Sequence, residues 1–237
     1  KRFGRKIRAD DWPEIGTPTW PLAEQAIKDG RIDEALELVD VARFENNFPR
    51  MGFHNIMMKT QNFIAEKFGE EQIEKLWRYL GESSVHSTLV GEQAIAEQIQ
   101  TMCTVHRGLH SGPGDGINVG PGKFGGFTVV EEKDRFVLTF EPCGTGGRFA
   151  KMGVMKSTKK AYPWSWGRVG VPYNCCHCCW WWEIMPIEAT GYPIRIFEPE
   201  GLPDKCVSFF YKNPASVPDK YFTRLGLVKG QSLAGHK

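Results

Sequence analysis

The pattern of apolar and polar positions divides the chain into a helical first half and a mixed second half. Apolar residues recur at three- and four-residue spacing over residues 22–28, 32–39, 53–68, 70–80 and 89–102, which predicts four or five amphipathic helices. Gly30 and Gly69 follow two of these segments and are expected to end their helices. Residues 1–110 are therefore predicted to form a helical N-terminal part.

The second half changes character at residue 111. Residues 111–126 contain seven glycines and two prolines, which indicates a loop. Residues 127–130 and 135–140 predict a β-hairpin, and residues 194–197 and 206–211 predict a second strand pair. A helix is expected over residues 175–189 despite Pro186. We therefore predict an α+β fold, in which the helical part packs on a C-terminal antiparallel sheet with a cysteine-rich helix, within residues 111–237.

Composition excludes several classes of protein. The chain has 237 residues, of which 41% are hydrophobic and 24% charged, with a formal net charge of +2. No apolar run approaches the roughly 18 residues of a membrane span, and the balanced charge argues against nucleic acid as a partner. The run Gly120–Gly125 matches G-x-G-x-x-G, but it follows helices and precedes a strand, so we expect no nucleotide cofactor.

Cysteine usage bears on the compartment. Residues 1–10 are basic and lack the apolar core and cleavage site of a signal peptide. Four of the seven cysteines crowd into residues 175–179, which is unlike the spread disulfide framework of small secreted domains. We expect a cytoplasmic protein whose cysteines are thiols, thiolates or metal ligands.

The cysteine cluster contains two overlapping C-x-x-C units, Cys175/Cys178 and Cys176/Cys179, with His177 between them. This spacing lets two thiolates reach one ion, so bound Zn or Fe is expected. Cys143 and Cys206 each border a predicted strand and can add ligands. The same residues also suit buried packing, since free cysteine behaves as a small apolar side chain, or a redox dithiol. The predicted metal ligands are Cys143, Cys176, His177 and Cys206.

Residues 142–182 contain no Asp or Glu but six Lys or Arg, together with several Trp and Tyr. This mixture suits a small anionic or aromatic substrate, although solvated lysines and core tryptophans explain it equally well. Cys179 is the candidate thiolate nucleophile, and Glu183, one turn later on the same helical face, the candidate general base. The predicted substrate-binding residues are Arg148, Trp164, Trp166 and Trp181.

The C-terminal segments also resemble a known family. The cysteine-bearing helix is followed by Gly191-Tyr-Pro, by Ile194-Arg-Ile-Phe-Glu198 and by Lys205-Cys-Val-Ser-Phe-Phe210. This order resembles the C-terminal half of the L-2-amino-thiazoline-4-carboxylic acid hydrolase-like proteins and the related 4-vinyl-reductase-type small-molecule-binding domain. The resemblance implies that Cys176 or Cys179 lies close to Cys206, where several members hold a metal. The chain departs from it after Glu198, where Pro199–Gly201 replaces a further cysteine.

Together these features predict a metal- or thiolate-dependent hydrolase that acts on a small cyclic amidine or amide, or on a carboxylate-bearing compound. Metal-bound water or a cysteine thiolate would attack the polarised carbon. The alternatives are a non-catalytic small-molecule-binding or sensor module, and a subunit of a larger enzyme complex; a homo-oligomer is a further option. Four protein ligands close a metal site, whereas hydrolysis by metal-bound water needs an open position.

Overall fold

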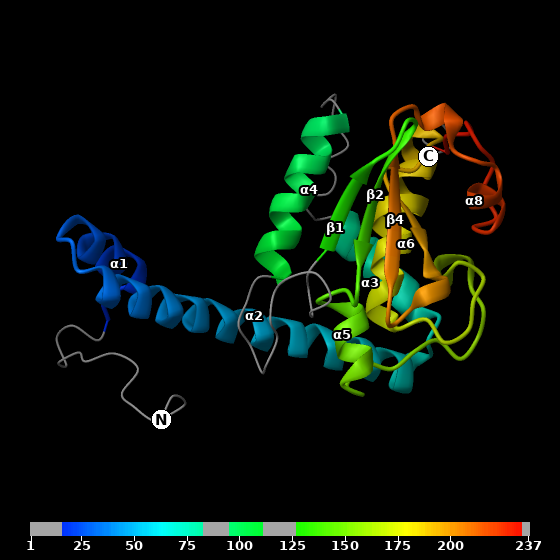
Figure 1. The fold of residues 1–237 in the computed structure, drawn as a ribbon. Helices are drawn as coiled ribbons and strands as arrows, with labels where there is room; N and C mark the ends of the chain where they lie inside the picture. Colours follow the sequence, from blue (N-terminus) through cyan, green and yellow to red (C-terminus); the bar gives the residue numbers. More distant parts are fainter. Residues whose placement is uncertain (1–15, 83–94, 111–126, 234–237) are drawn as a thin grey trace. The chain divides into compact units, whose positions relative to one another are not determined.

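The structure is a computed structural model that describes residues 16–82, 95–110 and 127–233. It confirms the α+β class: in these residues, helices α1 to α4 precede a four-stranded antiparallel sheet (Figure 1). The described residues form two compact units, one ending at Phe53 and the other beginning at His54. The predicted boundary between residues 110 and 111 stays a prediction, because the predicted loop over residues 111–126 lies outside the described residues.

The first unit contains α1 (Thr19–Lys28) and the first part of α2 (Ile32–Phe68). Small buried residues such as Ala23, Ala26 and Ala42 form its core, and Thr19 Oγ1 donates to Glu45 Oε1 at 2.8 Å. The prediction of separate helices over 32–39 and 53–68 was wrong, because α2 runs through both segments without a break. Pro49 lies within its span; an interior proline removes one N–H donor and crowds the carbonyl four residues earlier, but it does not end this helix.

The remaining predicted helices belong to the second unit. Helices α3 (Gln72–Glu82) and α4 (Ile95–His110) confirm two of them, with shifted bounds, and residues 83–94 lie outside the described residues. Gly69 ends α2 with a φ of +100°, which a residue with a side chain adopts only with strain. No helix in the described part of the chain is both long enough and apolar enough to cross a membrane.

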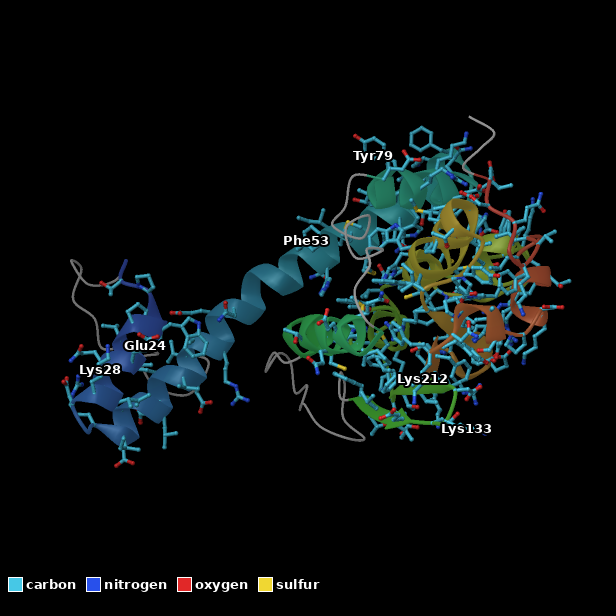
Figure 2. The ribbon with its side chains drawn as sticks, turned by 90° about the horizontal axis from the view of Figure 1, so that it is seen from above. Glu24, Lys28, Phe53, Tyr79, Lys133 and Lys212 are labelled. Carbon is cyan, nitrogen blue, oxygen red and sulfur yellow. The ribbon has the colours of Figure 1, made fainter. Side chains whose placement is uncertain are left out.

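The sheet contains both predicted strand pairs. Its strands are β1 (Phe127–Glu131), β2 (Arg135–Phe140), β3 (Ile196–Glu198) and β4 (Cys206–Tyr211), in the order β1-β2-β4-β3. Lys133 and Lys212 lie at one end of it (Figure 2), where the Lys212 N–H donates to the Asp134 carbonyl. The register pairs Phe140 with Cys206 at the other end, which brings the end of β2 beside the start of β4.

The predicted cysteine-rich helix is present, and Pro186 shapes it. It consists of η3 (Tyr173–Cys175), α6 (Cys176–Cys179), the π-helical turn η4 (Trp180–Ile184) and α7 (Met185–Thr190). Pro186 has no N–H to offer the Trp182 carbonyl four residues earlier. That carbonyl instead accepts the N–H groups of Ile194 and Arg195, at 3.0 and 3.2 Å. The carbonyl that Pro186 leaves without a helical partner therefore anchors the segment that leads into β3.

The cysteine-rich helix lies between the sheet and α3 (Figure 1). On one side, the Trp77 indole of α3 donates to the Tyr173 carbonyl, and Trp181 Nε1 donates to the Trp77 carbonyl. On the other side, Glu183 accepts the Phe197 N–H at the outer edge of β3. The unit also contains two short α-helices: α5 (Gly146–Lys151) follows β2, and α8 (Lys220–Thr223) follows β4.

Candidate functional site

A small cavity lies where the end of β2, the start of β4 and the start of the cysteine-rich helix meet. Four thiols line it, together with His177 and Glu198: Cys143, Cys175, Cys178 and Cys206. The cavity has a volume of about 20 Å³. That is close to the space which a single water molecule or ion needs.

Local structure explains why these thiols converge. Cys143 follows β2 by three residues, and Cys206 begins β4 opposite Phe140, so the strand register brings both to one end of the sheet. Cys175 and Cys178 are three residues apart at a helix start and therefore share a face. Gly146 packs against this face so closely that a Cβ there would lie 2.5 Å from Cys175 Sγ.

The second C-x-x-C pair points elsewhere. The Cys176 thiol donates to the Pro172 carbonyl and the Cys179 thiol to the Pro163 carbonyl, each at 3.7 Å. Neither residue is among those that line the cavity in the described part of the chain. Cys143, His177 and Cys206 of the predicted ligand set therefore lie together, while Cys175 and Cys178 occupy the place that the prediction gave to Cys176.

The thiols influence one another electrostatically. Burial raises the pKa of Cys175 well above its ordinary value, and the neighbouring Cys143, Cys178 and Cys206 raise it further. Burial, with a smaller contribution from Cys143, likewise raises the pKa of Cys206 to about 12. When no cation is bound, burial and this mutual repulsion therefore both disfavour the thiolate forms of Cys175 and Cys206.

The donor set fits Zn or Fe chemically, since both prefer thiolate ligands. Among the described residues, however, no group of three or more His, Cys, Asp or Glu side chains is already arranged around one point as metal ligands are. Ligation would therefore require rotation of thiol side chains between their staggered positions, which moves Sγ while the backbone stays in place.

His177 bridges the helix start and the cavity. Its Nδ1 contacts the carbonyl oxygen of Asn174, which acts only as an acceptor, so Nδ1 carries the proton. Nε2 then presents its lone pair to Cys178 Sγ, 3.5 Å away. The imidazole can therefore accept a proton from the Cys178 thiol, and Cys178 is half-buried at the cavity.

Glu183, the predicted general base, is fully engaged in structural contacts. Its Oε1 accepts Trp166 Nε1 and the Phe197 N–H, both at 2.8 Å, and its Oε2 accepts Arg224 Nη2 at 2.7 Å. Burial raises the pKa of Glu183, and the charge of Arg224 opposes that shift. Of the predicted substrate-binding residues, Trp166 lines the cavity and is held by this carboxylate.

The other predicted substrate-binding residues pack against neighbouring side chains away from the cavity. Arg148 is buried with its guanidinium over the Phe149 ring, and Trp164 is buried and stacked on Tyr162. Trp181 donates to the Trp77 carbonyl and packs against His177. None of the three is among the residues that line the cavity in the described part of the chain.

One charged residue near the thiols was not among the predicted site residues. Arg195 is only 2% exposed, and its Nε donates to Ser208 Oγ, two residues after Cys206 on β4. The sequence held a clue, because Arg195 interrupts an apolar run between Ile194 and Ile196. A charged residue within a buried strand segment usually has a specific partner.

Comparison of the chain with known family models, curated proteins and solved structures finds no match.

Proposed function

We propose that the chain is a metal-binding module of the vinyl-reductase type, in which Cys143, Cys175, Cys178 and Cys206 hold one Zn or Fe ion. The observation that carries this proposal is the meeting of four thiols at a cavity with room for one ion. Such a module belongs in a reducing compartment such as the cytoplasm, where free thiols persist.

The number of thiols favours a closed site over an open one. Four thiolates complete the tetrahedral shell of Zn and leave no position for a catalytic water. The size of the cavity also favours a single ion over an amide or amidine substrate beside that ion. A binding or sensor role therefore agrees better with the geometry than hydrolysis by metal-bound water.

The two overlapping cysteine pairs provide a matched test. We expect the full chain, purified anaerobically, to carry about one equivalent of Zn or Fe. Replacing Cys143, Cys175, Cys178 or Cys206 by Ser should each reduce the metal content sharply, because Ser is a poor ligand for these ions. Cys176→Ser and Cys179→Ser are the controls and should retain the metal, since those thiols point to the Pro172 and Pro163 carbonyls. Metal-free wild-type protein, or equal loss in all six variants, would refute the proposal.

The contact between His177 and Cys178 favours a second candidate, a thiol-dependent hydrolase. His177 Nε2 would take the Cys178 proton while the sulfur bonds to the amide or amidine carbon. The C–N bond then breaks, the leaving nitrogen receives the proton, and water hydrolyses the S–C bond.

This second candidate makes a distinct prediction. Metal-free protein should then hydrolyse small cyclic amides or amidines, and Cys178→Ser and His177→Gln should abolish the activity. Inactivity of the metal-free protein towards both compound classes would exclude it, whatever the metal analysis gives.

A further inference from the structure

Arg195 is a buried cation held rigidly on the sheet. It immediately precedes β3, and its Nε donates to Ser208 Oγ of β4 at 2.9 Å. Its Nη1 donates to Nε2 of His106, a residue of α4, at 2.7 Å. Two different elements therefore hold the guanidinium.

Aromatic rings surround this guanidinium. Its Cζ lies 4.6 Å from the ring centre of Phe197, 5.3 Å from that of Phe210 and 5.6 Å from that of Phe140. Ring faces attract a cation, but they carry no net charge. No ion pair joins Arg195 to a carboxylate among the residues that the structure describes. A buried charge without an opposite charge is unfavourable, so its presence requires a reason.

The thiols of the cavity supply that reason. Ser208, whose hydroxyl oxygen accepts from Arg195 Nε, lies two residues after Cys206 and therefore on the same face of β4. Phe140, whose ring faces the guanidinium, is the register partner of Cys206. The cation therefore lies behind the thiol cavity, on the sheet.

We propose that Arg195 is the counter-charge of the thiol centre, and that it strengthens metal binding by offsetting the negative charge which four thiolates around one divalent ion acquire. Such a centre carries a net charge of −2, and the buried guanidinium reduces the charge of the assembly to −1 without occupying a ligand position. Arg195 is thus a positioning residue that acts through the ligands. This inference rests on the metal site proposed above.

The test measures Zn²⁺ affinity of the full chain by competition with a chromophoric chelator. Arg195→Met removes the charge and keeps most of the volume, and we expect Zn²⁺ affinity to fall about 10- to 100-fold, as for other groups that support metal ligands. Arg195→Lys keeps the charge and should retain an affinity closer to wild type. Arg195→Gln provides the same measurement if the Met variant does not fold.

Arg135→Met is the matched control. Arg135 also lies on the sheet, with its Cζ 4.4 Å from the ring centre of Phe209, but it pairs with Tyr211 at the end away from Cys206. Removing it lowers the total charge by the same amount, and the Zn²⁺ affinity should not change. An equal loss in Arg135→Met would mean that general charge, rather than the position of Arg195, matters.

A second readout separates a charge effect from a loosened fold. In iron-loaded protein, a nearby positive charge disfavours Fe³⁺ relative to Fe²⁺, so the neutral Arg195 variants should have a lower Fe³⁺/Fe²⁺ reduction potential than wild type, and Arg195→Lys should not. If wild type binds no metal, both the proposed metal site and the proposed role of Arg195 are refuted. If wild type binds metal and the neutral variants match it in affinity and potential, only the role of Arg195 is refuted.

Discussion

Arg224 Nη2 lies 2.7 Å from Glu183 Oε2, in an ion pair whose carboxylate is only 1% exposed. The same arginine nitrogen also donates to the Phe197 carbonyl at 2.8 Å, and Glu183 accepts the Phe197 N–H. The pair therefore satisfies both backbone groups of an edge-strand residue beside the thiol cavity. The exposed edge of a strand can pair with another chain, and the Glu183–Arg224 pair blocks this at the edge of β3.

Neutralising this carboxylate should destabilise the second unit. Glu183→Gln leaves Arg224 without its charge partner, and we expect a loss of about 3 kcal/mol in the free energy of unfolding. Urea denaturation at pH 7 measures it. Glu188→Gln is the control, because Glu188 pairs with Arg78 in a more exposed position and should cost about 1 kcal/mol or less. Equal losses in the two variants would contradict a special role for the buried pair.

Stability should depend on pH through Glu70. Burial alone would raise the pKa of this carboxyl, but the N–H groups of Lys159 and Lys160 and the Tyr173 hydroxyl bind the carboxylate and lower it overall. A lowered pKa in the folded state adds stability above the unfolded value of about 4.3, and this stability is lost as pH falls through the folded value.

Glu70→Gln tests this dependence. The variant should be roughly 1–3 kcal/mol less stable than wild type near pH 7, and the difference should shrink as both are acidified below about pH 4. Urea midpoints across this range measure it, with the exposed neighbour Glu71→Gln as the control. A difference that stays constant with pH would show that the carboxylate charge contributes nothing.

The candidate site could be predicted from the sequence only in part. Cys143 and Cys206 were identifiable, because both border recognisable strands and antiparallel pairing brings such positions together. The sequence did not show which of the overlapping C-x-x-C pairs lines the cavity, because the two pairs have the same spacing and only the rotation of the helix decides which one faces it. That rotation depends on distant contacts, such as Tyr173 with Glu70 and Asn174 with Gln61.

The same limit applies to charge and to the fold. The strands and most helices can be predicted from local periodicity. The pairing of Glu183 with Arg224 cannot, because it joins residues 41 positions apart and nothing in either segment indicates the other as its partner. Glu183 had the expected helical position, yet its neighbours make it a structural carboxylate. Arg195 shows the converse, since its proposed role depends on Cys206, which only the fold brings near it.

Two glycines with nearly equal backbone angles should respond differently to alanine. Gly170 and Gly191 have φ values of +83° and +84°. A Cβ at Gly170 meets nothing within 4 Å, so Gly170→Ala should cost about 1–2 kcal/mol from backbone strain alone. A Cβ at Gly191 would lie 2.7 Å from the carbonyl carbon of Gly230, and the crowding should add about 1–3 kcal/mol. Thermal or urea unfolding of both variants decides whether the C-terminal segment packs there.

The neighbouring glycines at the start of α5 should separate metal binding from stability. A Cβ at Gly146 would come 2.5 Å from Cys175 Sγ, the end of a side chain that can rotate, whereas a Cβ at Gly147 would come 2.5 Å from the Pro203 carbonyl oxygen, which is backbone. Gly146→Ala should therefore displace a ligand thiol and lower Zn²⁺ affinity about tenfold or more, while the free energy of unfolding of the metal-free protein changes little. Gly147→Ala should lower that free energy by about 1–3 kcal/mol, because backbone must move.

Chelator competition and urea denaturation of both variants measure the two effects. If Gly146→Ala bound Zn²⁺ as tightly as wild type, Cys175 would be excluded as a ligand and the four-thiol centre would lose one of its members.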